Sequence, residues 1–203
     1  DNIEDLERFF AQAIEAGCEG IMAKDPESPY VAGVREWLWI KYKRDYKSEL
    51  TDTLDLVAVG AFAGKGKRAG TYGALLMAVF NPKENVFETV CKLGTGFDDL
   101  TLQRLPEIFK PYLRDTKHPL VKSNLDADFW FDPAIVLEVQ GAEITLSPVH
   151  TCAYNKIKPG YGLAIRFPRF TGRWRKDKRP EDATTTSEVI EMYKAQKRLK
   201  VEE

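Results

Sequence analysis

The first apolar pattern along the chain has the three-and-four spacing of a helix that buries one face. Residues 3–16 follow it, with Asn2 as a possible cap and Gly17 as a possible end. A short apolar run over residues 18–24 predicts a strand, and a second strand is expected over residues 36–46. These elements are too few to bury a core of their own.

After Thr53 the pattern becomes mostly that of strands. Apolar runs predict strands at 54–62, 72–80, 86–93, 135–139, 143–146 and 163–167. We expect the runs 135–139 and 143–146 to pair with each other. A glycine-rich turn, a helix capped by Asp98 or Asp99 and limited by Pro106, and a final helix of roughly a dozen residues complete the pattern. Thr185 and Glu188 form the capping box of that last helix.

Five or so short strands with one interposed helix fit a small Greek-key barrel of the OB type. Spacing alone does not separate this barrel from other small barrels. The fold class expected is therefore mainly β with flanking helices.

The strand over residues 36–46 carries two lysines on one face. Alternation along a strand points Lys41 and Lys43 the same way, while the tryptophans at 37 and 39, with Leu38 and Ile40, are expected to be buried. Two adjacent like charges repel unless an anion lies between them, and a phosphate is the obvious candidate. The alternative is a solvated edge strand whose lysines block aggregation.

Composition and charge narrow the class of protein. The 203 residues, 43% of them hydrophobic and 30% charged, predict one or two globular domains. No apolar run is long enough for a membrane span, and no signal peptide opens the chain. The net charge of −1 argues mildly against a generic nucleic-acid binder, but the basic residues cluster at 41–47, 65–68 and 166–179. The three widely spaced cysteines suggest reduced thiols in a cytosolic setting.

Three ordered motifs carry a resemblance to a known family. They are E-G-I-M-A-K at 19–24, W-I-K-Y-K-R-D-Y at 39–46 and R-K-D-K at 175–178. They resemble nucleotidyltransferase motifs IV, V and VI of ATP-dependent DNA ligases, and most closely those of the archaeal replicative and eukaryotic type I enzymes. The intervening blocks D-T-L-D-L, G-K-R-A-G, K-L-G-T-G-F, R-F-P-R-F and P-E-D-A-T-T are similar too.

The resemblance implies two domains. Residues 1–46 would be the C-terminal end of an α+β adenylation (nucleotidyltransferase) domain, and residues 47–203 an OB-fold domain with a C-terminal helix. The segment 44–50 between them is the expected hinge.

The resemblance also implies roles for the residues of motifs IV and V. Glu19 would bind Mg²⁺, and Lys24 would contact the nucleotide phosphate. Arg35 would belong to the nucleotide pocket, while Lys41 and Lys43 would hold the α-phosphate and offset charge during phosphoryl transfer. Without the resemblance, Glu19 reads as a solvated carboxylate at a strand end and Arg35 as a loop arginine in water.

Motif VI would act on the rest of the triphosphate. The resemblance implies that Arg175 and Lys178 reach the β- and γ-phosphates of ATP, with Asp177 orienting Lys178. A charged surface loop is the alternative for such a tetrapeptide.

The basic residues of the glycine-rich turn are candidates for binding DNA. Lys65, Lys67 and Arg68 are expected to project from a hairpin tip and contact DNA phosphates, with a solubilising loop as the alternative. Lys92 and Thr95 could add minor-groove or backbone contacts.

The implied function is the sealing of nicks in duplex DNA, in replication, repair and recombination, with ATP and Mg²⁺ as cofactors. Ligases of this family attack ATP with the lysine of a K-x-D-G motif, and this sequence contains none. We therefore expect a C-terminal portion that is inactive alone and needs the upstream remainder of the ligase. Expected partners are nicked DNA and ATP, with a sliding clamp as a candidate; the expected location is cytoplasmic, or nuclear in a eukaryote.

Two alternatives stay open. A capping guanylyltransferase or RNA ligase shares the motif types, although D-T-L-D-L, G-K-R-A-G and K-L-G-T-G-F favour a DNA ligase. A stand-alone OB module binding single-stranded nucleic acid or a protein would show aromatic stacking platforms, and would not need Glu19, Lys41 and R-x-D-K together.

Overall fold

The computed structural model describes residues 2–16, 18–27, 39–43 and 52–202. The chain divides into an N-terminal unit, Asp1–Lys47, and a C-terminal unit, Ser48–Glu203. Each unit has its own internal packing.

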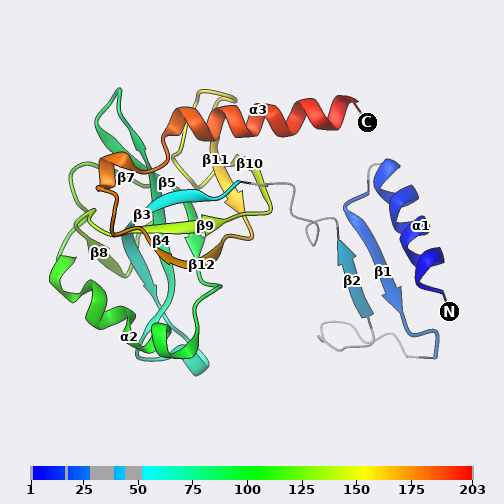
Figure 1. Ribbon diagram of the computed structural model, residues 1–203, viewed down its shortest axis with the longest axis horizontal. Coiled ribbons are helices and arrows are strands. Elements are labelled where there is room, and N and C mark those ends of the chain that lie inside the picture. Colours follow the sequence, from blue (N-terminus) through cyan, green and yellow to red (C-terminus); the bar gives the residue numbers. More distant parts are fainter. Residues whose placement is uncertain (1, 17, 28–38, 44–51, 203) are drawn as a thin grey trace. The chain divides into compact units, whose positions relative to one another are not determined.

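The N-terminal unit consists of one helix and a two-stranded antiparallel sheet (Figure 1). Its elements are α1 (Ile3–Glu15), β1 (Gly20–Lys24) and β2 (Trp39–Lys43). Asn2 caps α1 as expected, because its side-chain oxygen accepts a hydrogen bond from the Glu4 amide at 3.1 Å. Phe10 of α1 is buried, and its ring lies 4.5 Å from that of Tyr42, so the helix packs on one face of the strand pair.

The C-terminal unit is mostly β-structure. Its strands are β3 (Leu54–Ala63), β4 (Tyr72–Asn81), β5 (Val86–Leu93), β6 (Leu113–Arg114), β7 (Val121–Lys122), β8 (Phe129–Phe131), β9 (Val136–Gln140), β10 (Glu143–Ser147), β11 (Gly162–Arg166) and β12 (Arg169–Trp174). Its helices are α2 (Asp99–Phe109) and α3 (Thr186–Glu202), with the short 3₁₀ turns η2 (Gly66–Arg68), η3 (Lys110–Tyr112) and η4 (Pro180–Asp182). The apolar runs therefore predicted most of the long strands within a residue or two.

The strands curl into a barrel of the OB type. The main sheet runs β12-β9-β3-β4-β5-β7, and β10 pairs with β11. The amides of Thr151 and Cys152 donate to the Thr89 carbonyl of β5, while Cys152 pairs with Leu163 of β11. This short segment closes the barrel between β5 and β11. Apart from the short strands β6, β7 and β8, the chain forms a meander of three strands (β3–β5), then α2, then the longer strands β9–β12. This is the order of an OB-fold Greek-key barrel.

The expected pairing of 135–139 with 143–146 is wrong. β9 pairs with β3 and β12, and β10 pairs with β11. Val139 faces Phe170 and Ile144 faces Ile165 in one continuous register, so β9 and β10 are two halves of one long strand that is interrupted at residues 141–142. A two-residue gap looks like a hairpin turn in the sequence. Here both halves pair with the β11–β12 segment instead.

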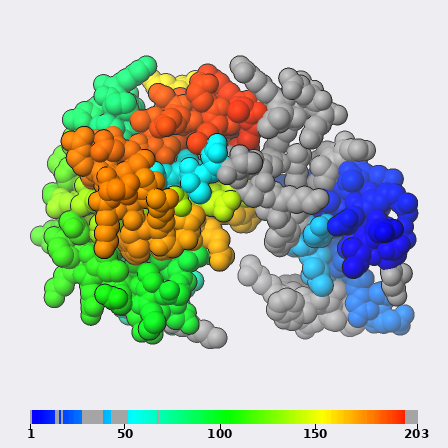
Figure 2. Space-filling model, viewed as in Figure 1, coloured from blue at the N-terminus to red at the C-terminus, as the bar shows by residue number. Residues whose placement is uncertain are grey.

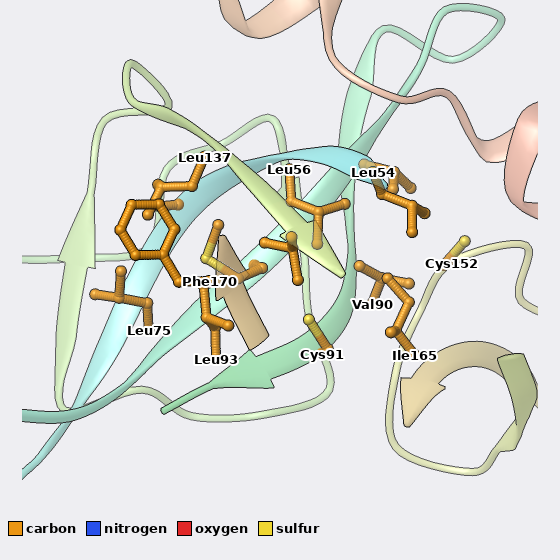
Figure 3. Packing of buried hydrophobic residues seen from close by; sticks show 14 of the residues in the cluster. Leu54, Leu56, Leu75, Val90, Cys91, Leu93, Leu137, Cys152, Ile165 and Phe170 are labelled. Atoms are coloured by element: carbon orange, nitrogen blue, oxygen red, sulfur yellow. The ribbon is translucent and has the colours of Figure 1, made fainter. Parts of the chain in front are cut away.

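Two apolar clusters lie on the two sides of the barrel wall. Leucines from β3, β4, β5 and β9 meet Phe170 and Ile165 inside the barrel (Figure 3). Val57 and Val59 point outward, into a second cluster with Phe80 and Trp130. Both faces of β3 are buried from Leu56 to Ala61, and there the sequence is apolar without alternation.

Both long helices of this unit have the caps that the sequence predicts. The Asp98 carboxylate accepts from the Thr101 amide at 2.6 Å at the start of α2, and Pro106 is accommodated inside that helix. Thr185 and Glu188 form the capping box of α3, with the Thr185 amide donating to Glu188 at 2.6 Å. At 17 residues α3 is longer than expected, and it packs on the barrel through Val189 and Tyr193.

Candidate functional site

In the N-terminal unit, the strand register gathers lysines on the face opposite α1. Lys24 lies across from Trp39, Met22 across from Lys41, and Gly20 across from Lys43. Directly paired residues of an antiparallel sheet point to the same face. Lys24 and Lys41 are exposed there, and the Lys24 ammonium lies 4.5 Å from the centroid of the Trp39 ring. That Lys41 and Lys43 share one face stays a prediction.

The burial expected along this strand is partly wrong. Ile40 is 57% exposed and Trp39 is only half-buried, and the ring contact with α1 is made at Tyr42. Trp37, Leu38, Arg35 and the expected hinge at 44–50 lie outside the described residues.

Glu19 is exposed and directly precedes β1, which brings it to the end of the sheet where Gly20 faces Lys43. Among the residues that the structure describes, no group of three or more metal-ligating side chains gathers. A single carboxylate suits Mg²⁺, which keeps several waters and takes its other ligands from substrate phosphates. Glu19 thus fits a substrate-assisted magnesium site and not an all-protein one.

In the C-terminal unit, Arg175 and Lys178 converge on one carboxylate, that of Asp55 in β3. The Arg175 Nη1 lies 2.8 and 2.7 Å from the two Asp55 oxygens, and the Lys178 ammonium lies 2.6 Å from Asp55 Oδ2. Asp55 is fixed by its neighbours: its amide donates to the Thr184 hydroxyl at 2.9 Å, and its carbonyl accepts from the Thr184 amide. The ends of the R-K-D-K tetrapeptide therefore meet at a preformed anionic anchor.

Asp177 does not orient Lys178, contrary to expectation. It binds Arg175, which donates from Nε at 3.0 Å and from Nη2 at 2.8 Å in a two-pronged contact. This hydrogen bonding lowers the pKa of Asp177 to about 2 and raises the pKa of Arg175. The Arg175 side chain is 15% exposed and that of Lys178 is 31% exposed, so Lys178 is the more accessible cation.

Arg68 does not project from the glycine-rich turn. Its guanidinium donates to the carbonyls of Gly73 at 3.0 Å and Gly94 at 2.8 Å, which fastens the turn to the end of β5. Lys65 is exposed, as expected, and Lys67 lies within η2. Lys65 and Arg68 therefore differ in their surroundings, although they are three residues apart in the sequence.

Thr95 also has a structural partner. Its hydroxyl donates to the Pro168 carbonyl at 2.7 Å, and its own carbonyl accepts from the Phe170 amide. Gly96 follows with φ of +93°, and a Cβ there would lie 2.2 Å from the Phe170 carbonyl oxygen. The K-L-G-T-G-F and R-F-P-R-F blocks are thus held together by close backbone contact. Lys92 is exposed, with its ammonium 4.1 Å from the centroid of the Phe62 ring.

Asp55 was not expected from the sequence to belong to this cluster. A signal was present, since Asp55 stands between two fully buried leucines, Leu54 and Leu56. A carboxylate in such a run needs a charged partner. The sequence did not show that the partner lies 120 residues away.

A small closed barrel with clustered cations is typical of proteins that handle nucleotides or nucleic acids. Comparison with known families narrows this class. The family described as "ATP dependent DNA ligase C terminal region" matches residues 68–178, and "ATP dependent DNA ligase domain" matches residues 1–43. The chain therefore belongs to the ATP-dependent DNA ligase family.

Curated relatives agree over nearly the whole chain. DNA ligase 2 of Thermofilum pendens is 62% identical over 202 residues, which is 98% of this chain and 34% of the relative. A probable DNA ligase of Aquifex aeolicus is 59% identical over 203 residues, which is 99% of this chain and 35% of the relative. The chain thus spans about a third of the length of these relatives.

A solved structure supports the fold. The ligase domain of LigD from M. tuberculosis is 26% identical, with a TM-score of 0.51 over 88% of this chain and 51% of that one. Within the part of the chain that the structure describes, no helix is long and apolar enough to cross a membrane.

Proposed function

We propose that this chain is the C-terminal part of an ATP-dependent DNA ligase that seals nicks in duplex DNA, in replication, repair and recombination. The observation that carries the proposal is the convergence of Arg175 and Lys178 on Asp55. It places the two ends of the family's R-x-D-K motif together, in a chain whose relatives are named DNA ligases. A capping enzyme, an RNA ligase or a stand-alone OB module is not favoured by these relatives.

The exposed lysines Lys24 and Lys41 of the N-terminal unit support a role in nucleotide binding. Lys24 and Lys41 bind the phosphates of ATP and later of AMP, with Lys43 adding charge and Arg35 contributing to the nucleotide pocket. Fixed cations of this kind stabilise the charge that develops on phosphate oxygens in the transition state. Glu19 would supply one carboxylate ligand to Mg²⁺, and the bound ion would neutralise phosphate charge.

The covalent chemistry requires a lysine that this sequence does not provide, since it contains no K-x-D-G motif. That lysine nitrogen attacks the α-phosphorus of ATP, and diphosphate leaves. The 5′-phosphate oxygen of the nick then attacks the same phosphorus and releases the lysine. Finally the 3′-hydroxyl attacks the 5′-phosphorus, AMP leaves, and the strand is joined. The 203-residue chain alone therefore forms no AMP adduct.

Arg175 and Lys178 act on the leaving diphosphate. Arg175 also holds the motif in shape, because it pairs with Asp55 and Asp177. Lys178 exchanges Asp55 for a phosphate oxygen. Lys65, Lys67 and Lys92 contact DNA phosphates, whereas Arg68 and Thr95 support that surface by holding its loops together.

We expect the complete polypeptide to be cytoplasmic, or nuclear in a eukaryote. The test measures the steps of its reaction separately. Lys178→Ala should slow self-adenylylation with labelled ATP about a hundredfold, equivalent to roughly 2.7 kcal/mol. It should largely spare the joining of a nick that already carries 5′-AMP, because no diphosphate is present in that step. Glu19→Ala should depress both steps, and Lys194→Ala, a distant exposed lysine, is the matched control. Equal loss of both steps in Lys178→Ala would contradict the assigned role.

A further inference from the structure

Two adjoining hollows lie beside the irregular segment that follows η3 in the C-terminal unit. The first, of about 500 Å³, is lined by residues from both ends of the stretch 115–126 and by Trp130 of β8. The second, of about 410 Å³, lies between the same stretch, the turn after β4 and the loop after β10. Lys117, Ser123 and Asn124 line both hollows, which therefore form one groove, the 115–126 groove. α2 and the segment that follows it lie at the surface of the unit (green in Figure 2).

Hydrogen bonds to the barrel hold the walls of this groove in place. The Leu120 carbonyl accepts from the Phe87 amide at 2.7 Å, beside the parallel pairing of β7 with β5. The Lys122 carbonyl accepts from the Thr151 hydroxyl at 2.7 Å, which attaches the same segment to the loop after β10. Because the walls are preformed, a ligand needs to order little of the protein when it binds.

The unpaired charges differ between the two ends of the groove. Asp115 and Asp126 line the first hollow, are exposed, and have no hydrogen-bond or ion-pair partner among the residues that the structure describes. Lys156, in the second hollow, and Lys117, which borders both, are exposed cations that likewise have no such partner within the described chain. One end is therefore acidic and the other basic.

The remaining charged groups of the second hollow are already paired. Glu84 forms an ion pair with Lys122. Glu88 is buried and accepts three hydrogen bonds from the surrounding chain. These groups offer little to a ligand, so the free charge of this end is that of its lysines.

Trp130 adds a hydrogen-bond donor to the first hollow. Its side chain is 8% exposed, and its indole N–H has no acceptor in the described part of the chain. Among the described residues, His150 has the one fully buried polar side-chain atom without a partner, so the Trp130 nitrogen reaches open space. That space is the hollow that Trp130 lines. Asn124, where the hollows meet, offers a carbonyl and an amide N–H, the same groups that a peptide backbone presents.

We propose that the 115–126 groove binds an extended peptide segment of another protein, with an arginine or lysine side chain and, further along, a carboxylate side chain. The cation pairs with Asp115 and Asp126, and the carboxylate with Lys117 and Lys156. The indole and the amide between them bond the peptide backbone. Opposite charges at the two ends fix the direction of the peptide.

Other ligands suit the groove less well. Each hollow alone has the volume of a small-molecule site, so the groove is too long for one amino acid. Nucleic acid is disfavoured because its phosphates would meet the unpaired carboxylates of Asp115 and Asp126.

The test is a titration of the 203-residue chain with short capped peptides that carry one arginine and one glutamate at different separations in a glycine–serine background. For the separation that fits, the indole N–H signal of Trp130 should shift in NMR spectra, with a dissociation constant below about 1 mM. Asp126→Asn and Lys156→Gln should each raise that constant about threefold to tenfold. Asp52→Asn and Lys110→Gln are the matched controls, because they remove the same charges from exposed residues that line neither hollow.

Four results would overturn the proposal. In the first, no peptide of the set shifts the Trp130 signal at that concentration. In the second, a peptide with arginine alone binds as tightly as the best peptide, so the basic end takes no part. In the third, the control variants lose as much binding as the groove variants, which would indicate only general charge. In the fourth, a nicked duplex displaces the peptide, which would assign the groove to nucleic acid. None of these results depends on ligase activity, so the proposed function stands or falls separately.

Discussion

The two units of the chain differ in how they bury their apolar residues. In the described part of the N-terminal unit, Phe10 is the one buried hydrophobic side chain, while Ile3, Phe9 and Ile40 are more than half exposed. The C-terminal unit has fully buried leucines on five strands (β3, β4, β5, β9 and β11) and a second cluster outside the barrel. Burial of apolar surface is the main force that favours folding. The C-terminal unit therefore has a core of its own, whereas the described part of the N-terminal unit carries its exposed lysines on a scaffold with little core.

The largest effect should appear when the two units are produced separately. Residues 48–203 should unfold in one cooperative urea transition, because the barrel and its core are complete within them. Residues 1–47 should show no cooperative transition, because a helix and two strands bury too little surface. Circular dichroism of both pieces is the measurement. A sharp transition in residues 1–47 would contradict this difference, because it would show that the N-terminal unit also folds cooperatively.

Substitutions of two phenylalanines, one in each unit, test the same difference within the intact chain. Phe131 is fully buried and stacks on Phe109 with ring centroids 4.6 Å apart, so Phe131→Ala should lower the free energy of unfolding by about 3–5 kcal/mol. Phe9 is 60% exposed on α1, and Phe9→Ala should change it by less than about 0.5 kcal/mol. Urea unfolding of each variant measures the difference. Similar losses would mean that Phe9 has a partner surface that its own unit does not show.

A buried histidine makes the C-terminal unit sensitive to acid. His150 is 9% exposed, its Nδ1 has no hydrogen-bond partner among the described residues, and burial lowers its pKa to about 4. The unfolded chain takes up this proton near pH 6.5 and the folded chain does not, so stability falls as the pH drops from 6.5 toward 4. The loss from this group should be about 2 kcal/mol between pH 6.5 and 5.

His150→Gln should remove most of that loss, measured as the difference in unfolding free energy between the two pH values. His118→Gln, at the other histidine of the sequence, is the matched control. If His150→Gln shows the same pH dependence as His118→Gln and the unmodified chain, His150 is not the group that causes the loss.

The smallest effect concerns two basic neighbours in the glycine-rich turn. Lys65→Ala in the complete protein should reduce the slope of log binding constant against log salt for nicked DNA by about 0.9. Arg68→Ala should instead lower stability by about 1 kcal/mol or more, because it leaves the carbonyls of Gly73 and Gly94 without their donor. Filter binding at several salt concentrations and urea unfolding distinguish the two roles. Equal salt slopes for both variants would show that Arg68 is available to DNA after all.

Much of the local structure could be read from the sequence. The caps at Asn2, Asp98 and Thr185 and the long apolar strands all follow from spacings of a few residues. Such spacings act through neighbouring backbone groups, so they do not depend on the rest of the fold. The family motifs likewise stood in the sequence in their order.

Partner choice across the fold was decided only by the tertiary structure. The sequence suggested a hairpin between 135–139 and 143–146, but closure of the barrel makes them parts of one strand. It suggested that Arg68 projects and that Asp177 orients Lys178, but carbonyls and carboxylates elsewhere in the fold bind Arg68 and Lys178 instead. A charged side chain takes the nearest partner in space, and that distance depends on how distant segments meet. The sequence therefore determined the elements and motifs, and the barrel decided which charges remain available to a ligand.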